Sequence, residues 1–177
     1  MKKSGKIALG GIVSALSIVI LFLSNIFPFV EYAIPMIAGA LMIIIMVEMN
    51  RRWAFMVYAG VSLLSLILVA NPEPKVLYIA FFGLYPILKS DLERIPSRAG
   101  EWAAKLLFFN TAVLLAALAV VFLFRVPVED FNEFGKWTIP IFAVLFNFVF
   151  VVYDIALSRV ITLYLYRAQD TLHRIFK

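Results

Sequence analysis

The feature that most constrains this chain is a series of long apolar stretches separated by short charged or proline-rich breaks. Six such stretches follow one another, at 7–27, 32–49, 53–70, 75–92, 103–124 and 138–166. A helix needs about 20 mostly apolar residues to cross the roughly 30 Å hydrocarbon core of a bilayer. With 64% hydrophobic and 15% charged residues, a water-soluble domain of this size would expose much apolar surface. We therefore predict an all-α polytopic membrane protein with six transmembrane helices in one domain, residues 1–177.

The positions of the basic residues predict the orientation of these helices. If the N-terminus lies in the cytoplasm, only three of the 16 Lys and Arg residues fall in outer loops, namely Lys75, Arg125 and Lys136. The excess on the inner side follows the positive-inside rule. We expect both termini to be cytoplasmic in a cell membrane, with residues 167–177 forming a basic tail on the anionic inner leaflet.

The stretch 75–92 is the weakest of the six predicted spans. Its uninterrupted apolar part, 76–88, is only about 20 Å long as a helix. We expect the helix to begin just after Pro74 and to continue through Lys89 to Leu92, with the lysine side chain reaching towards the headgroups.

Small residues are concentrated in the first stretch, in the sequence ALGGIVSALSIVI. Gly10 with Ser14 and Gly11 with Ala15 are pairs four residues apart, which let two membrane helices approach closely. These faces either pack within the chain or dock a separate membrane protein, and Gly11 and Ala15 are our candidate docking residues.

Four ionisable residues are expected at one depth, near the inner boundary of the bilayer. Glu48 and Asp154 lie about 24 Å along spans entered from outside, and Lys89 and Lys105 reach the same level. We predict an inner polar cluster of these residues, because charges inside a membrane usually pair. The alternative is that each is an ordinary interfacial charge in contact with headgroup water.

Polar side chains in the outer half of the predicted bundle are candidates for contact with a ligand. The preferred set is Asn25, Tyr32, Tyr78 and Asn147. The alternative is that they form hydrogen bonds between helices, which is the commoner use of such residues in membranes.

Signatures of catalysis and of cofactor binding are scarce. The chain has no cysteine, its one histidine is His173 in the tail, and no nucleotide-binding motif is visible. We predict no catalytic residue, cofactor or resident metal, and no nucleic-acid partner, because the basic residues form no single stripe. An enzyme that uses Glu48 and Asp154 as carboxylates is the third alternative.

Six spans in a chain this short, both termini inside, and the small-residue first helix resemble the substrate-binding S components of energy-coupling factor transporters. In that family, small residues of the first helix contact a shared coupling subunit, and Gly11 and Ala15 have the matching spacing. The resemblance implies a bundle that binds a vitamin-like molecule or a metal ion from outside and works with a coupling subunit and its ATPases. The first outer loop, FPFVE, is shorter than in that family.

Two other stretches, FFGLYPILKSDLER and EWAAKLLFFN, are similar to an uncharacterised family of small membrane proteins from Gram-positive bacteria. That similarity implies no activity. In size and number of spans the chain is also similar to the cell-shape membrane protein MreD, which implies the alternative function of a membrane scaffold.

Overall fold

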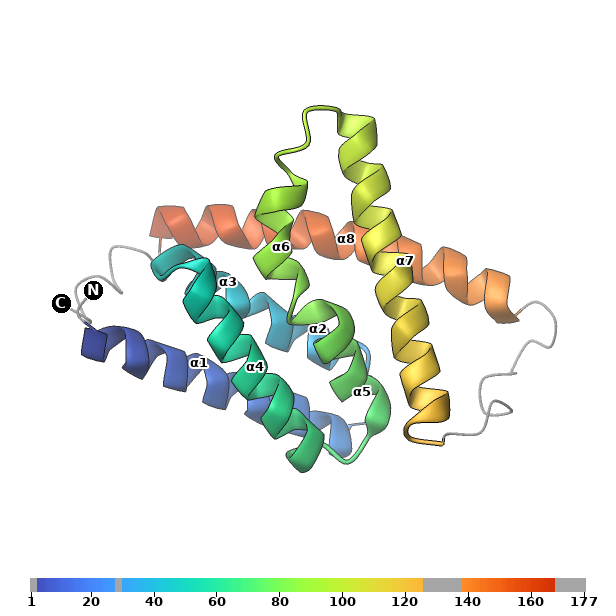
Figure 1. The fold of residues 1–177 in the computed structure, drawn as a ribbon, viewed down its shortest axis with the longest axis horizontal. Helices are drawn as coiled ribbons and strands as arrows, with labels where there is room; N and C mark the ends of the chain where they lie inside the picture. The colour runs from blue at the N-terminus through green and yellow to red at the C-terminus, as the bar shows by residue number, and fades with distance from the viewer. Residues whose placement is uncertain (1–2, 28–29, 126–137, 168–177) are drawn as a thin grey trace.

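The computed structural model describes residues 3–27, 30–125 and 138–167, and all secondary structure in these ranges is helical (Figure 1). The elements are α1 (Lys3–Phe22), the 3-10 turn η1 (Leu23–Asn25), α2 (Ala33–Ala40), α3 (Met42–Glu48), α4 (Arg51–Leu68), α5 (Pro72–Leu77), the π-helical turn η3 (Tyr78–Phe82), α6 (Tyr85–Leu92), α7 (Arg98–Phe122) and α8 (Thr138–Arg167). The all-α prediction is confirmed for these residues. Of the predicted basic tail, only Arg167 lies within them.

Four helical segments are long and apolar enough to cross a membrane. They are Lys3–Asn25, Arg51–Leu68, Arg98–Phe122 and Pro140–Tyr166, with mean hydropathies of 1.3 to 2.5. The other two predicted spans, 32–49 and 75–92, are built from shorter helical pieces. Within the described ranges, therefore, four predicted spans are continuous helices and two are interrupted.

The residues at their first turns explain where α4 and α5 begin, slightly before the predicted spans. The side chain of Asn50 accepts a hydrogen bond from the backbone N–H of Trp53 at 3.2 Å, so α4 begins at Arg51. Helix α5 begins at Pro72, because proline is well tolerated in a first turn, where its missing N–H would have no helical partner.

Pro86 explains the interruption between α5 and α6. Its ring would clash with the carbonyl of the residue four positions earlier, Phe82, where the regular ladder of hydrogen bonds stops. The backbone widens there into the π-helical turn η3, and Gly83 N–H donates to the Tyr78 carbonyl at 2.8 Å. The hydroxyl of Tyr58 donates to the Ile79 carbonyl at 2.6 Å and so satisfies part of the altered backbone.

The two interrupted segments touch at Gly39. A Cβ atom at this position would lie 2.2 Å from the carbonyl oxygen of Phe82, so only glycine permits the observed approach of α2 to η3.

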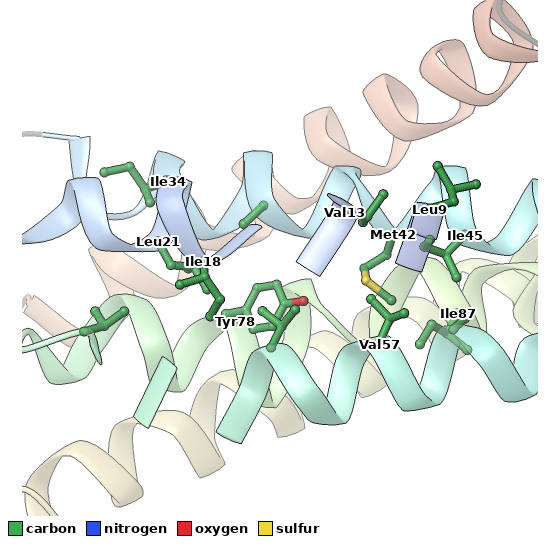
Figure 2. Close-up of a cluster of buried hydrophobic side chains, with 14 residues drawn as sticks. Leu9, Val13, Ile18, Leu21, Ile34, Met42, Ile45, Val57, Tyr78 and Ile87 are labelled. Carbon is green, nitrogen blue, oxygen red and sulfur yellow. The ribbon is translucent and has the colours of Figure 1, made fainter. Parts of the chain in front are cut away.

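Two apolar clusters fill the space between the helices. The first joins α1, α2, α3 and α4 around Tyr78, with Leu9, Ile45 and Ile87 towards one end and Leu21 and Ile34 towards the other (Figure 2). The second joins η3, α6, α7 and α8 through stacked and edge-on rings of Phe81, Tyr85, Phe109, Phe150 and Tyr153.

Polar contacts between helix ends lie at two levels of the bundle. At the first, which we call the Asn25 level, Asn25 after α1 accepts from Ala70 N–H after α4 at 3.0 Å, and Tyr32 before α2 donates to Glu73 in α5 at 2.8 Å. At the second, the Asp154 level, Arg51 at the start of α4 pairs with Asp91 near the end of α6. If the helices ran alternately outward and inward through a membrane, the two helix ends that each contact joins would lie on the same side of it.

Replacing Gly39 by alanine should destabilise the protein, because the new methyl group meets backbone atoms that cannot rotate away. We expect a loss of at least about 1–3 kcal/mol in free energy of unfolding in detergent. Gly60→Ala is the matched control, since a Cβ there meets no atom within 4 Å. Equal stability of the two variants would contradict the close approach.

Candidate functional site: a buried ion cluster

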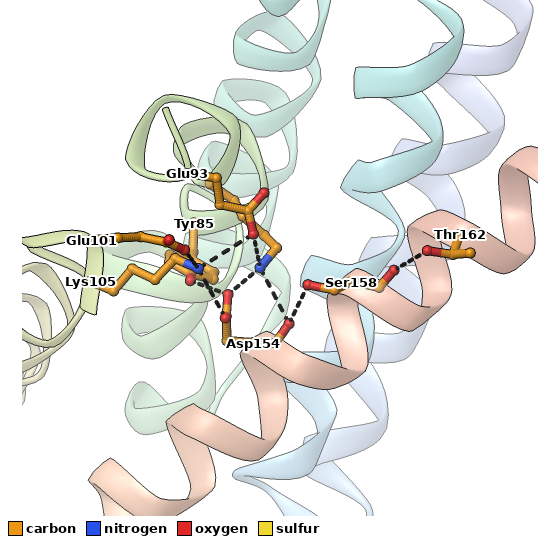
Figure 3. A network of polar contacts seen from close by, with 8 residues as sticks. Tyr85, Glu93, Glu101, Lys105, Asp154, Ser158 and Thr162 are labelled. Carbon is orange, nitrogen blue, oxygen red and sulfur yellow. Dashed lines mark hydrogen bonds and ion pairs between the residues drawn. The ribbon is translucent and has the colours of Figure 1, made fainter. Parts of the chain in front are cut away.

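Three helices meet at a buried carboxylate, Asp154 of α8. Its Oδ1 accepts hydrogen bonds from Lys89 Nζ of α6 and from the Tyr85 hydroxyl, and its Oδ2 accepts from Lys105 Nζ of α7 at 3.0 Å (Figure 3). Both lysine side chains are 2% exposed and that of Asp154 is 5% exposed. The sequence predicted these three residues at one depth, and the structure brings them into direct contact.

Two glutamates complete the cluster on its more exposed side. Glu93 Oε1 lies 2.7 Å from Lys89 Nζ and 3.4 Å from Lys105 Nζ, while Glu101 Oε1 lies 2.7 Å from Lys105 Nζ. The Glu93 side chain is 41% exposed and that of Glu101 is 21% exposed. Every charged group in the ion cluster, which we define as Tyr85, Lys89, Glu93, Glu101, Lys105 and Asp154, thus has a partner of opposite charge.

The order of residues along α6 and α7 explains how these side chains converge. Tyr85, Lys89 and Glu93 follow one another at intervals of four, and so do Glu101 and Lys105, which places each set on one face of its helix. The aromatic rings of the second apolar cluster pack beside Tyr85 and lower the local polarity. The i, i+4 spacing was a visible signal for Tyr85, Glu93 and Glu101, which the sequence analysis missed.

The arrangement suits charge pairing between helices better than chemistry on a substrate. Both carboxylate oxygens of Asp154 are already occupied, so it presents no free base. Among the described residues, no group of three or more His, Asp or Glu side chains could hold a metal ion. A lone charge in a membrane helix costs about 2.5–3.5 kcal/mol or more, and pairing removes much of that cost.

Glu48, the fourth residue of the predicted inner polar cluster, has a different partner. Its Oε1 accepts a hydrogen bond from the Tyr164 hydroxyl at 2.8 Å, which ties the end of α3 to the C-terminal part of α8. Depth along a span can be predicted from sequence, but the direction in which a side chain leaves its helix depends on packing.

Asn147, one of the four predicted ligand residues, forms a closed pair with Asn110 of α7. Each amide NH₂ donates one proton to the other side chain, at 2.9 and 3.0 Å. The second proton of each goes to a backbone carbonyl four residues earlier, Leu106 or Ala143, at 2.8 Å. All four amide protons are therefore used, two in joining α7 to α8 and two within the helices themselves.

Asn25 binds the connection between α4 and α5, and Tyr32 binds the first turn of α5. The Asn25 oxygen accepts from Ala70 N–H and, at 3.4 Å, from Asn71 N–H, while Tyr32 binds Glu73. Glu31 lies close to Glu73, and partial burial, followed by the charge of Glu73, raises the pKa of Glu31 above its usual value.

Tyr78 occupies a third environment. It is fully buried in the first apolar cluster, its ring packs against the position of Gly83, and its hydroxyl has no hydrogen-bond partner among the residues that the structure describes. The four predicted ligand residues therefore do not lie together. Asn25 and Tyr32 lie at the Asn25 level, Tyr78 lies in the apolar core, and Asn147 lies at the contact between α7 and α8.

The two faces of α1 that carry small residues have different surroundings. Gly10 is buried, and a Cβ there would lie 3.4 Å from Val57 of α4, so this face packs within the chain. Gly11 and Ala15 are exposed, and a Cβ on Gly11 would meet nothing within 4 Å. The predicted docking residues are therefore accessible on the surface of α1.

Replacing Asp154 by asparagine should leave two buried lysines without their shared counter-charge. We expect a loss of about 3–5 kcal/mol in free energy of unfolding in detergent, the usual cost of breaking a buried pair. Glu93→Gln is the control, because this more exposed carboxylate should cost about 1 kcal/mol or less. Similar losses for both variants would count against a buried cluster.

Replacing Glu31 by glutamine should raise the melting temperature at neutral pH, because the ionised form is disfavoured beside Glu73. A carboxyl whose pKa is raised on folding destabilises the folded state above that pKa and has no such effect once it is protonated in both states. The gain from Glu31→Gln should therefore shrink as the pH falls into the acid range. A gain that is independent of pH would contradict this account.

Comparisons with known proteins identify no relative of this chain. No protein family, curated protein or solved structure matches the chain closely enough to indicate kinship. The site is therefore interpreted from its own geometry.

Proposed function

We propose that the chain is a six-span membrane subunit, with both termini in the cytoplasm, that binds a small solute and docks a partner membrane protein through α1. Six crossings are supported by the two polar levels. Contacts at the Asn25 level involve the end of α1, the start of α2, the end of α4 and the start of α5. Contacts at the Asp154 level involve the end of α3, the start of α4 and the end of α6. The positive-inside rule then assigns the Asp154 level to the cytoplasmic side.

The observation that carries the proposal is the contact between the two interrupted segments. Helical breaks are costly in a bilayer, because backbone groups must find other partners there. Solute transporters commonly place such breaks together, near the middle of the membrane, where the solute binds. Here α2 and η3 touch through Gly39 and Phe82, and the π-helical form of η3 is itself frequent at functional sites.

The solute class follows from the resemblance to S components of energy-coupling factor transporters. It is a vitamin-like molecule or a metal ion taken from outside. Among the predicted ligand residues, Tyr78 is favoured, because it belongs to η3 and its buried hydroxyl has no hydrogen-bond partner within the described part of the chain. The partner in this proposal is a coupling subunit with its ATPases, and the exposed face of Gly11 and Ala15 is its docking surface.

A membrane scaffold of the MreD kind is the second candidate. The observation in its favour is that Asn25 and Asn147, expected to face a solute, are bonded within the chain. An enzyme has less support, since Glu48 and Asp154 bind different partners.

Replacing Gly11 and Ala15 together by leucine should abolish co-purification of a partner while leaving a folded monomer, because the added side chains prevent close helix contact. The test is affinity purification from native membranes in mild detergent, followed by mass spectrometry of proteins and small molecules. Gly60→Leu is the control, since that position also has open space but lies on α4.

The identity of what co-purifies separates the candidates. A coupling subunit with ATPases, or a retained metabolite, supports the transport function. Cell-envelope proteins without a small molecule would support the scaffold. Unchanged recovery of every partner from the leucine variant would exclude docking by this face of α1.

A further inference from the structure

Two crossings of the six-span arrangement, the second and the fourth, are not formed by a helix long and apolar enough to span by itself, and the fourth also contains buried lysines. This fourth crossing consists of α5, η3 and α6, from Pro72 to Leu92, and it is absent from the segments long and apolar enough to span by themselves. It contains three prolines and two buried lysines, Lys75 and Lys89. Something outside the segment must therefore stabilise it in the bilayer.

Lys75 is stabilised by nearby groups. Its Nζ donates to the backbone carbonyl of Val69 at 2.9 Å and to that of Ala70 at 3.4 Å, and it lies 4.6 Å from the centre of the Phe124 ring. These contacts lie at the Asn25 level, beside the predicted outer boundary. Lys75 therefore does not require a counter-charge from a later helix.

Lys89 depends on a residue much later in the chain. Its carboxylate partners are Glu93, which is on the same helix and 41% exposed, and Asp154, which is buried on α8. Helix α8 is synthesised after α6. Until α8 is present, Lys89 has the more exposed Glu93 as a partner but lacks its buried counter-charge, so the cost of its charge in the fourth crossing is only partly offset.

We infer that α8, through Asp154, holds the fourth crossing in the membrane. The dependence runs in one direction, because α8 has a mean hydropathy of 2.2 and is long and apolar enough to span by itself. Helix α7 is equally apolar, and its Lys105 keeps Glu101 as a local partner. Asp154 is thus a positioning residue for α6, and this inference rests on the proposed six-span topology.

The absence of native cysteine makes the inference directly testable with single cysteines in the full chain. Ala70→Cys marks the connection before the fourth crossing, and Ala99→Cys, at the start of α7, marks the end of the connection after it; both positions are exposed. Intact cells are treated with a membrane-impermeant maleimide. In the parent chain, Ala70→Cys should be labelled and Ala99→Cys should be protected, and labelling of Ala70→Cys also reports that each variant is inserted.

Asp154→Ala should increase labelling of Ala99→Cys about tenfold, since the fourth crossing then fails in part of the population. Adding Lys89→Met should restore protection, because the crossing no longer carries a charge that needs Asp154. Ser158→Ala, one turn along α8, should leave labelling unchanged.

The outcomes distinguish the inference from the topology on which it rests. Protection of Ala99→Cys in Asp154→Ala would overturn the inference and leave the six-span topology intact. Labelling that persists in the Lys89→Met, Asp154→Ala double variant would also overturn it, because the defect would not act through Lys89. Labelling of Ala99→Cys in the parent chain would overturn the six-span topology itself.

Discussion

The rest of the structure depends on the cost of placing charge in hydrocarbon. Lys89, Lys105 and Asp154 come from three helices, and each would be expensive in a membrane without the others. Their contact fixes where α8 crosses α6 and α7, because a shift of one helical turn would separate the charges. Glu93 and Glu101 then balance the lysines from the more exposed side, so that the ion cluster is satisfied without a ligand.

A second constraint acts on the backbone. Pro86 prevents a continuous helix from Pro72 to Leu92, and the resulting π-helical turn brings the Phe82 carbonyl against Gly39. Tyr58 and Gly83 supply hydrogen bonds to the altered backbone. The chain thus maintains an interrupted helical segment that a simple membrane anchor would not need, and this is why the proposed function is binding of a solute in addition to assembly with partners.

Sequence reasoning was most successful for properties that depend only on position along the chain. Apolar stretches predicted the helices, and counting residues along them placed Lys89, Lys105 and Asp154 at one depth, where the structure joins them. It was least successful in predicting the direction in which each side chain leaves its helix. Glu48 was expected at the same depth but accepts a hydrogen bond from Tyr164, and Asn147 binds Asn110, because the direction of each side chain depends on how the helices pack. The breaks at Leu41 and Gly83 were also not predicted, although Pro86 was a visible signal for the second.

The central claim is that the Lys89–Asp154 contact couples α6 to α8 energetically, and a double-mutant cycle measures this most directly. The free energy of unfolding in detergent would be determined for the parent chain, for Lys89→Met, for Asp154→Asn and for the double variant. Our account predicts a coupling free energy above about 1 kcal/mol, because the double variant removes both buried charges together. Losses that add to within about 0.3–0.5 kcal/mol would contradict it.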